Sequence, residues 1–355
     1  MTEQSYPKSG SHVLVLLASF VIVVWGITLA QSVLVLLFVS MFLAILGAPP
    51  VQWLERKRVP SALAVLIVVS GMIGVFFLVG VLVGASLSNF TDRLPWYQSR
   101  LQEQVELFKA FLASKGIENA DKIITEYANP AELMRLTAGL LAGLGSALSN
   151  IFLILLIVTF ILLEASSFPT KLRAAFGSQL LGIPQFIRFM DDIKHYVIVK
   201  TGVSATTGVL AGVWVAILGV DSPVLWGFLA FLLNYVPSLG VIIAAVPVVL
   251  LAVIQYGFGR ALLVVLGYLV VNLVVGTILE PRLVGRNVGL STLVVFLSLI
   301  LWGSVFGLVG MVLCVPLTMS LKLSLAMNDR TRWIAVLLGR EVSISDLASR
   351  DVSQS

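Results

Sequence analysis

Asn234-Tyr-Val-Pro237-Ser-Leu-Gly240 interrupts the middle of the long apolar stretch Pro223–Tyr256. This stretch is too long for one plain membrane crossing, because about 20 apolar residues already span a bilayer core. Pro237 removes a backbone donor, and Gly240 allows the chain to turn. In lipid, non-helical backbone persists only where protein or a wet cavity shelters it. The interruption therefore predicts a broken membrane segment whose turn lies inside the protein.

A second apolar stretch, Leu290–Leu325, is interrupted in a corresponding place, between Gly303 and Gly307. Each stretch follows one clean span, and each carries a Val-Pro motif after its break, in Ala245-Val-Pro247 and Cys314-Val-Pro316. Interrupted segments in corresponding halves of a membrane protein point to the binding site of a transporter. The pattern indicates a duplicated unit made of one span and one broken segment.

The composition of the whole chain is that of a membrane protein. Of its 355 residues, 59% are hydrophobic and 12% are charged, whereas soluble domains carry about 25% charged residues. The net charge of +5 comes from basic residues spread between apolar runs, which indicates cytoplasmic loops and argues against a nucleic-acid partner. We predict an all-α polytopic membrane protein with about eight membrane helices or helical hairpins. Two of these are broken or re-entrant segments in the C-terminal half, and a helical insert lies outside the cytoplasm.

The predicted unbroken spans are Val13–Ala30, Val33–Leu46, Leu63–Leu87, Ala147–Leu163, Tyr196–Leu218 and Ala261–Leu279. We divide the chain into N-terminal spans for scaffolding and oligomerisation (1–88), an extracytoplasmic helical insert (89–137), a fourth span with a cytoplasmic interfacial helix (138–195), a transport core of two span-plus-hairpin units (196–327) and a polar cytoplasmic tail (328–355). The insert contains six Lys or Arg and seven Asp or Glu, so we expect it to lie in water.

Basic residues set the expected orientation. Placing the cluster Glu55-Arg-Lys-Arg58 in the cytoplasm puts both termini and the Lys171–Lys200 region inside, and the insert outside. If each broken stretch is a single span, Arg282 and Arg286 lie outside. If each is a re-entrant hairpin, this pair lies inside and only Arg260 remains outside. We favour the hairpins, and the spanning arrangement stays open at this point.

The candidate substrate site consists of polar and helix-breaking residues at the two breaks. One side is formed by Asn234, Pro237, Ser238 and Gly240, and the other by Asn272, Glu280, Ser304 and Gly307. We expect the backbone groups freed at the breaks to bind a polar solute together with these side chains. Ionisable groups inside a membrane are functional candidates by default. A proline kink without a function and a snorkelling acid at a helix end are the structural alternatives.

Enzymatic readings find no support in the sequence, which has no HExxH motif, no Gly-x-Ser-x-Gly elbow, no Walker A loop and no paired intramembrane aspartates. We therefore expect no enzyme, no cofactor and no metal site. Without a nucleotide-binding loop, the chain cannot use ATP on its own. The single cysteine, Cys314, lies in an apolar run and excludes an intramolecular disulfide.

Three blocks resemble a known family. Asn234–Gly240 is similar to the Asn-x-Ile-Pro-x-Ile-Gly signature of the autoinducer-2 exporter family. Glu280-Pro-Arg-Leu-Val-Gly285, followed by Val288-Gly-Leu-Ser-Thr-Leu293, resembles its Pro-Lys-x-x-Gly and Gly-Leu-His-Pro block. Gly303–Pro316 resembles its glycine-rich ending. The order of early spans, insert and motif-rich C-terminal half is also similar to that of the family.

The resemblance implies a bacterial inner-membrane permease with eight spans that forms homo-oligomers, described as pentamers in the family. Members have been assigned export of the signalling furanone autoinducer-2, and others sodium/proton exchange. In this chain Ser291-Thr292 stands where the family often has His-Pro. The change removes a titratable group and weakens the inference of proton coupling.

We predict a secondary transporter, surrounded by membrane lipid, that exports a small polar uncharged solute similar to autoinducer-2 by alternating access of its C-terminal hairpins, which move against a scaffold of the first spans. The membrane part of the C-terminal half offers few acids besides Asp221 and Glu280, which favours an uncharged solute over a cation. One alternative is a sodium or lithium/proton antiporter, with that cation as the coupling ion. Another is a non-transporting membrane scaffold whose insert binds an envelope partner.

Overall fold

The computed structural model describes residues 25–114, 150–165, 183–237, 239–284, 289–327 and 331–339, together with a few isolated positions. These residues are almost all helical, and the only β-pairing among them is an isolated bridge between Leu290 and Gly339. Five of the described helices are long and apolar enough to cross a membrane. The predicted all-α polytopic membrane fold is thus confirmed. Half of the predicted span Val13–Ala30 lies outside the described residues, as does Ser238.

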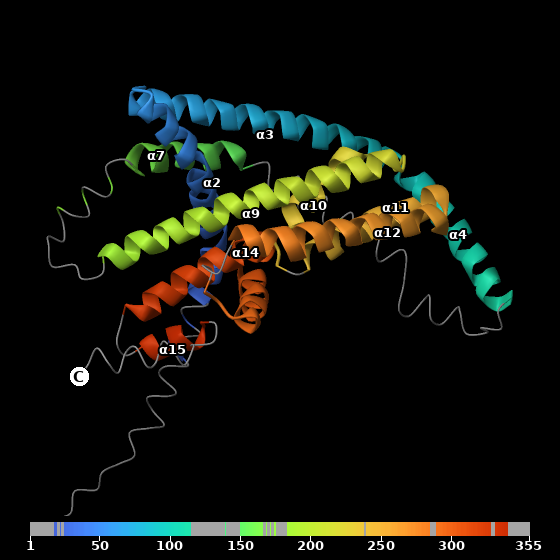
Figure 1. Cartoon of the computed structure of the whole chain (residues 1–355). Helices are drawn as coiled ribbons and strands as arrows, with labels where there is room; N and C mark the ends of the chain where they lie inside the picture. Colours follow the sequence, from blue (N-terminus) through green and yellow to red (C-terminus); the bar gives the residue numbers. More distant parts are fainter. Residues whose placement is uncertain are drawn as a thin grey trace, which may run out of the picture.

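The helices in chain order are α2 (Gln31–Arg56), α3 (Ser61–Asp92), α4 (Leu94–Ser114), α7 (Ile151–Ala165), α9 (Ile183–Ile217), α10 (Pro223–Leu233), α11 (Gly240–Tyr256), α12 (Phe258–Val271), the π-helical segment η2 (Asn272–Leu279), α13 (Glu280–Val284), α14 (Thr292–Ala326) and α15 (Arg332–Leu337). Figure 1 shows α3, α9 and α12 running lengthwise, with α4 projecting from one end. We call that end the distal end, and the end where α9 begins the basal end.

Helices α10 and α11 form a helical hairpin, hairpin 1, with both of its ends at the distal end. The hydroxyl of Tyr256, in the last turn of α11, donates a hydrogen bond to the carbonyl oxygen of Gly219 at 2.6 Å. The second arm therefore returns to the turn from which the first arm starts. The reversal is tight, because a Cβ at Gly240 would lie 1.8 Å from the carbonyl oxygen of Leu233.

Helix α14 is a second hairpin, hairpin 2, which reverses at Gly307. This residue has φ 62° and ψ −142°, a conformation that favours glycine. The indole N–H of Trp302 donates to Oγ1 of Thr318 at 2.9 Å, although a straight helix would separate these residues by ~24 Å. The two ends of the hairpin meet where Nζ of Lys322 donates to the carbonyl oxygen of Gly289 at 2.6 Å. Both broken stretches are thus hairpins.

The two hairpins enter the bundle from opposite ends, and their tips overlap. Val236, at the tip of hairpin 1, packs in a buried cluster with Tyr196 of α9 and with Leu299 and Cys314 of hairpin 2. Leu308, next to the tip of hairpin 2, packs against the apolar cluster around hairpin 1. In the chain, hairpin 1 follows α9, and hairpin 2 follows the long apolar helix that begins with α12.

Helix α2 contacts both tips through two phenylalanines one helical turn apart. The ring of Phe38 meets Phe306 of hairpin 2 at 5.5 Å, and the ring of Phe42 meets Tyr235 of hairpin 1 at 5.6 Å, both edge to face. Such pairs contribute about 0.5–1.5 kcal/mol beyond their buried area. Helix α2 also packs with α3 and α7 around a separate apolar cluster. This three-helix group therefore supports the tips from one side.

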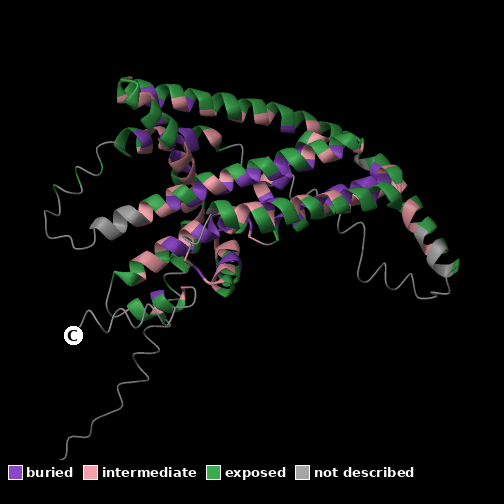
Figure 2. Ribbon diagram, in the orientation of Figure 1, coloured by how far each residue is buried: buried purple, intermediate pink, exposed green. Residues whose placement is uncertain are grey.

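Glycines bring α9 and hairpin 1 into close contact. A Cβ at Gly208 would lie 2.7 Å from the carbonyl oxygen of Gly227, and a Cβ at Gly212 would lie 3.4 Å from the Cα of the same glycine. Small residues at this spacing let membrane helices approach backbone to backbone. Figure 2 shows the buried residues along such inner faces, with exposed residues on the outer face of α3. The outer residues are largely apolar, as expected for a surface that faces lipid.

The hairpins also explain the distribution of basic residues. The ring of His195 lies 3.3 Å from the carbonyl oxygen of Leu283, which places α13 beside the basal half of α9. Arg260 bonds the carbonyl oxygen of Leu218 at the distal end. The cluster Arg56–Arg58 lies where α3 begins, at the basal end (Figure 1). This is the arrangement that the hairpin alternative predicted.

Replacing Gly240 with alanine should destabilise the protein by about 1–3 kcal/mol or more, because the added carbon overlaps the Leu233 carbonyl. The matched control is Gly71→Ala in α3, where nothing lies within 4 Å of the added carbon and alanine is favoured by about 1 kcal/mol. Thermal unfolding in detergent, followed by circular dichroism, compares the two. Equal unfolding temperatures would contradict the tight reversal of hairpin 1.

Candidate functional site

The hairpin 1 tip and α13 meet a line of polar side chains on α9. Lys200 and Ser204 lie one turn apart and are 3% and 0% exposed, and Thr201 lies beside them. Buried polar groups must be hydrogen-bonded or paired, because burial without a partner costs several kcal/mol. We call this set the polar seam; its members are Lys200, Thr201, Ser204, Asn234, Tyr235 and Glu280.

Two hydrogen bonds tie the tip of hairpin 1 to α9. The side-chain amide of Asn234 donates to Oγ of Ser204 at 2.9 Å. The hydroxyl of Tyr235 donates to Oγ1 of Thr201 at 2.8 Å. Asn234 is 5% exposed. Opening this contact therefore requires new partners for these groups, which a polar solute or water can supply.

The charged part of the seam is an ion pair between Lys200 and Glu280, with Nζ and Oε1 2.5 Å apart. Their side chains are 4% and 25% exposed. Lys200 stands at the midpoint of α9, ~25 Å from either end of the helix. We predicted that the Lys171–Lys200 region lies in the cytoplasm. This prediction is wrong for the side chain of Lys200, which is buried beside Glu280. Because the charges cancel, the seam as a whole is neutral.

The π-helical segment η2 positions Glu280 beside α9. The backbone N–H of Glu280 bonds the carbonyl oxygen of Val275, five residues earlier. Wider turns of this kind are rare and often occur at functional sites. They change the direction in which the following side chains leave the helix, and here the first residue after the segment is the carboxylate that pairs with Lys200.

The backbone at the tip of hairpin 1 is already paired. The N–H groups of five described residues donate within the turn or to the preceding helix, namely those of Asn234, Tyr235, Val236, Leu239 and Gly240. The expectation that N–H groups freed by the break bind a solute is wrong at these positions. Side chains, rather than backbone donors, form the polar seam.

The structure unites only part of the predicted site. Asn234 bonds Ser204, and Glu280 pairs with Lys200. These two partners lie one turn apart on α9. Pro237 is half-buried at the tip. As described above, Gly240 and Gly307 have turn-forming roles, and Ser238 lies outside the described residues.

Two residues of the predicted site, Ser304 and Asn272, have no bond to the polar seam in the described part of the chain. Ser304 is exposed, and its hydroxyl donates to the carbonyl oxygen of Leu301 in its own helix at 2.8 Å. Asn272 is half-buried, with Oδ1 2.9 Å from the place that a Cβ of Gly276 would occupy. Within the described part of the chain, no hydrogen bond or ion pair links either side chain to the polar seam.

Sequence reasoning missed the α9 side of the seam and Tyr235. The available signal was the spacing of Lys200 and Ser204, which puts a cation and a hydroxyl on one face of an apolar helix. The identity of their partners had no signal, because Glu280 is 80 residues from Lys200 along the chain.

A family model described as AI-2E family transporter matches residues 14–327, which include both hairpins and the entire seam. The chain belongs to the AI-2E transporter family. The AI-2 transport protein TqsA of Escherichia coli K12 is 39% identical over 330 residues, which cover 93% of this chain and 96% of that protein.

Other relatives of this AI-2E family chain have names that describe transport more generally. The putative transport protein YhhT of Escherichia coli K12 is 36% identical over 333 residues, covering 94% of this chain and 95% of that protein. A putative transport protein of Haemophilus influenzae is 36% identical over 330 residues, covering 91% and 94%. The family and the apolar helices show a multi-pass membrane permease.

Replacing Glu280 with glutamine should destabilise the protein by about 3 kcal/mol, because it leaves the buried ammonium of Lys200 without a countercharge. The control is Glu164→Gln, whose exposed pair with Lys171 should cost about 0–1 kcal/mol. Chemical denaturation in detergent measures both.

The double variant Lys200→Met with Glu280→Met should recover most of the stability lost in Glu280→Gln, because apolar side chains of similar volume can replace a buried pair. A Glu280→Gln variant as stable as Glu164→Gln would show that the ion pair is not buried.

Proposed function

We propose that this AI-2E family protein is a secondary transporter that exports a small polar uncharged solute, of the class of autoinducer-2, across the bacterial inner membrane. The observation that carries this proposal is the convergence of two opposed hairpins near a neutral, buried polar seam. A site between elements that enter from opposite ends can be exposed to one side at a time. Broken helices meeting at mid-bundle are a common design of transporter sites.

Electrostatics favour an uncharged solute. The seam contains one ammonium and one carboxylate, 2.5 Å apart, and its other members are hydroxyls and one amide. A charged solute would have to replace one member of the ion pair and leave the other unpaired, at a cost of several kcal/mol. A neutral solute with hydroxyl or carbonyl groups needs only to exchange hydrogen bonds with Asn234, Ser204, Thr201 and Tyr235.

The polar contacts also suggest how the site opens. We infer that hairpin 1 moves against α9 by releasing the Asn234–Ser204 and Tyr235–Thr201 hydrogen bonds. Each bond contributes about 0.5–1.5 kcal/mol net, so exchanging both for bonds to water or to the solute costs little enough for a conformational cycle. Helix α2 would act as the fixed support, because its two phenylalanines touch both tips.

The similarity to the AI-2 transport protein TqsA supports autoinducer-2 as the solute class. The sequence resemblance and the positions of the basic clusters lead us to propose an inner-membrane location with both termini in the cytoplasm. They also lead us to propose a homo-oligomer, a pentamer by family resemblance, assembled through the N-terminal spans.

Replacing Asn234 with alanine should lower the initial rate of autoinducer-2 uptake into protein-containing liposomes about tenfold, since the solute loses one buried hydrogen-bond partner worth about 1.4 kcal/mol. The control is Thr159→Val in α7, whose hydroxyl bonds only within its own helix in the described structure. Unfolding temperatures should accompany the rates. A folded Asn234→Ala protein with unchanged uptake would contradict the assignment of the seam.

The second candidate function is sodium or lithium/proton exchange, favoured by one observation. Glu280 shares its buried site with Lys200, and a cation or proton that competes for the carboxylate would release the lysine. Adding sodium or lithium to vesicles with an acid interior should then dequench a pH-sensitive dye, and Glu280→Gln should abolish the response. The neutral-solute proposal predicts no response in either protein.

A further inference from the structure

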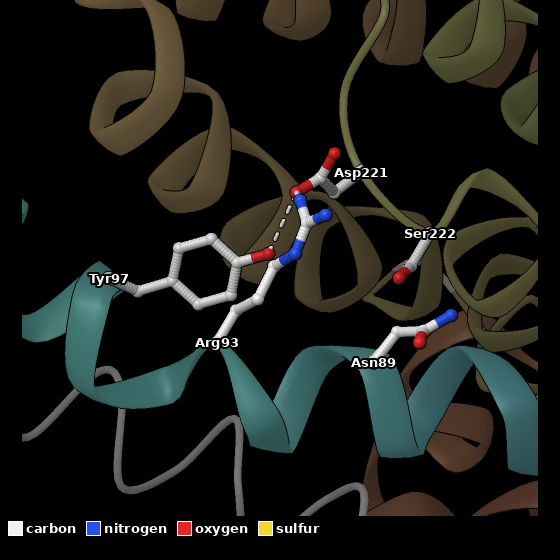
Figure 3. Close-up of a pocket in the computed structure, with 5 residues that line it drawn as sticks. All are labelled: Asn89, Arg93, Tyr97, Asp221 and Ser222. Atoms are coloured by element: carbon white, nitrogen blue, oxygen red, sulfur yellow. Dashed lines mark hydrogen bonds and ion pairs between the residues drawn. The ribbon is translucent and has the colours of Figure 1, made fainter.

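A second polar group lies at the distal end, where α3 and α4 meet the base of hairpin 1. Nη1 of Arg93 donates to Oδ2 of Asp221 at 2.7 Å, and the hydroxyl of Tyr97 donates to the same oxygen at 2.9 Å. Figure 3 shows both side chains pointing toward this carboxylate from α4 and its junction with α3. Asp221 belongs to the turn between α9 and α10, so the cluster links α4 to hairpin 1.

Two cavities adjoin this cluster. The smaller, of about 170 Å³, is lined by Asn89, Arg93, Tyr97, Asp221 and Ser222. The larger, of about 420 Å³, is lined by Arg93, Trp96, Asp221, Gln255 and Tyr256. Arg93 and Asp221 border both cavities, so the ion pair stands between them. The larger has the volume of a small-molecule site.

The lining of the larger cavity combines flat apolar rings with hydrogen-bonding groups. Trp96 and Tyr256 are 50% and 42% exposed, so neither residue is fully covered by the protein. Oδ2 of Asp221 accepts both bonds of the cluster, while no described side chain donates to its other carboxylate oxygen. Gln255 accepts the backbone N–H of Asp221 at 3.2 Å and fixes the position of the turn. Such a mixture suits a small ring that carries several hydroxyls.

The charges of the site favour an uncharged ligand. The guanidinium of Arg93 and the carboxylate of Asp221 neutralise each other. Burial of the phenol, together with its bond to Asp221, raises the pKa of Tyr97 to about 12, so its hydroxyl stays a neutral donor at physiological pH. Arg260 stacks on the Tyr256 ring at 4.0 Å. This extra positive charge at the rim is the reason to test a charged ligand as well.

We propose that the larger cavity is an outer binding site for an uncharged polyhydroxylated ring, whose hydroxyls bond Asp221 and Arg93 and whose apolar face lies against Trp96. The inference rests on the proposed function, because the transported solute belongs to this class. The site would hold the solute at the distal end of hairpin 1, before or after its passage between the tips.

Equilibrium dialysis of autoinducer-2 against the full-length protein in lipid nanodiscs tests the outer site. The Asn234→Ala background weakens binding at the seam and isolates the outer site. Saturable binding of one molecule per chain should remain there. Adding Trp96→Ala or Asp221→Asn should weaken it at least tenfold, and adding Trp53→Ala, an exposed tryptophan of α2, should leave it unchanged. D-ribose should compete for the site, and ribose 5-phosphate should not.

The outcomes separate the outer site from the proposed function. Binding that disappears in Asn234→Ala, and persists in Trp96→Ala and Asp221→Asn, would overturn the outer site and leave the transported solute standing. Outer binding without uptake of autoinducer-2 into liposomes would overturn the proposed function and leave the site. Competition by ribose 5-phosphate as strong as that by ribose would overturn the preference for an uncharged ring.

Discussion

Polar groups inside a bilayer must find their partners within the protein, and this requirement governs the whole arrangement. A hairpin that turns inside the membrane brings a loop, an asparagine and a tyrosine to a depth where water is scarce. Their partners here are hydroxyls on α9, and the backbone of the turn pairs with itself. A tip bound in this way is stable when closed, and its hydrogen bonds can be exchanged for bonds to the proposed solute.

The charged side chains must also find their partners within the protein. Lys200 is tolerable at the middle of α9 only because the π-helical segment presents Glu280 to it. The distal cluster repeats the principle in a wetter place, with Arg93 and Asp221 more exposed than the buried pair. The seam at mid-bundle and the cluster at the distal end are therefore both lined by ion pairs together with polar groups. Such a lining favours the proposed uncharged solute over an ion.

Some of this could be predicted from the sequence, for local reasons. Pro237, Gly240 and Gly307 mark the turns, because a missing donor and a positive φ are properties of single residues. The duplicated pattern indicated two equivalent breaks. Hydropathy could not decide between span and hairpin, since it does not report where an arm returns. The pairing of Lys200 with Glu280 was also out of reach, because it depends on the register between distant helices. Free backbone donors were a wrong expectation, since the tip closes its own turn.

The central claim is that the solute binds between the hairpin tips, and hydrogen–deuterium exchange of their backbone amides tests it most directly. Adding autoinducer-2 should slow exchange in residues 234–240 and in the facing segment 199–205 of α9, with no change in α7. Exchange at the tip that stays unaltered at saturating solute, while the same preparation transports it, would contradict the account.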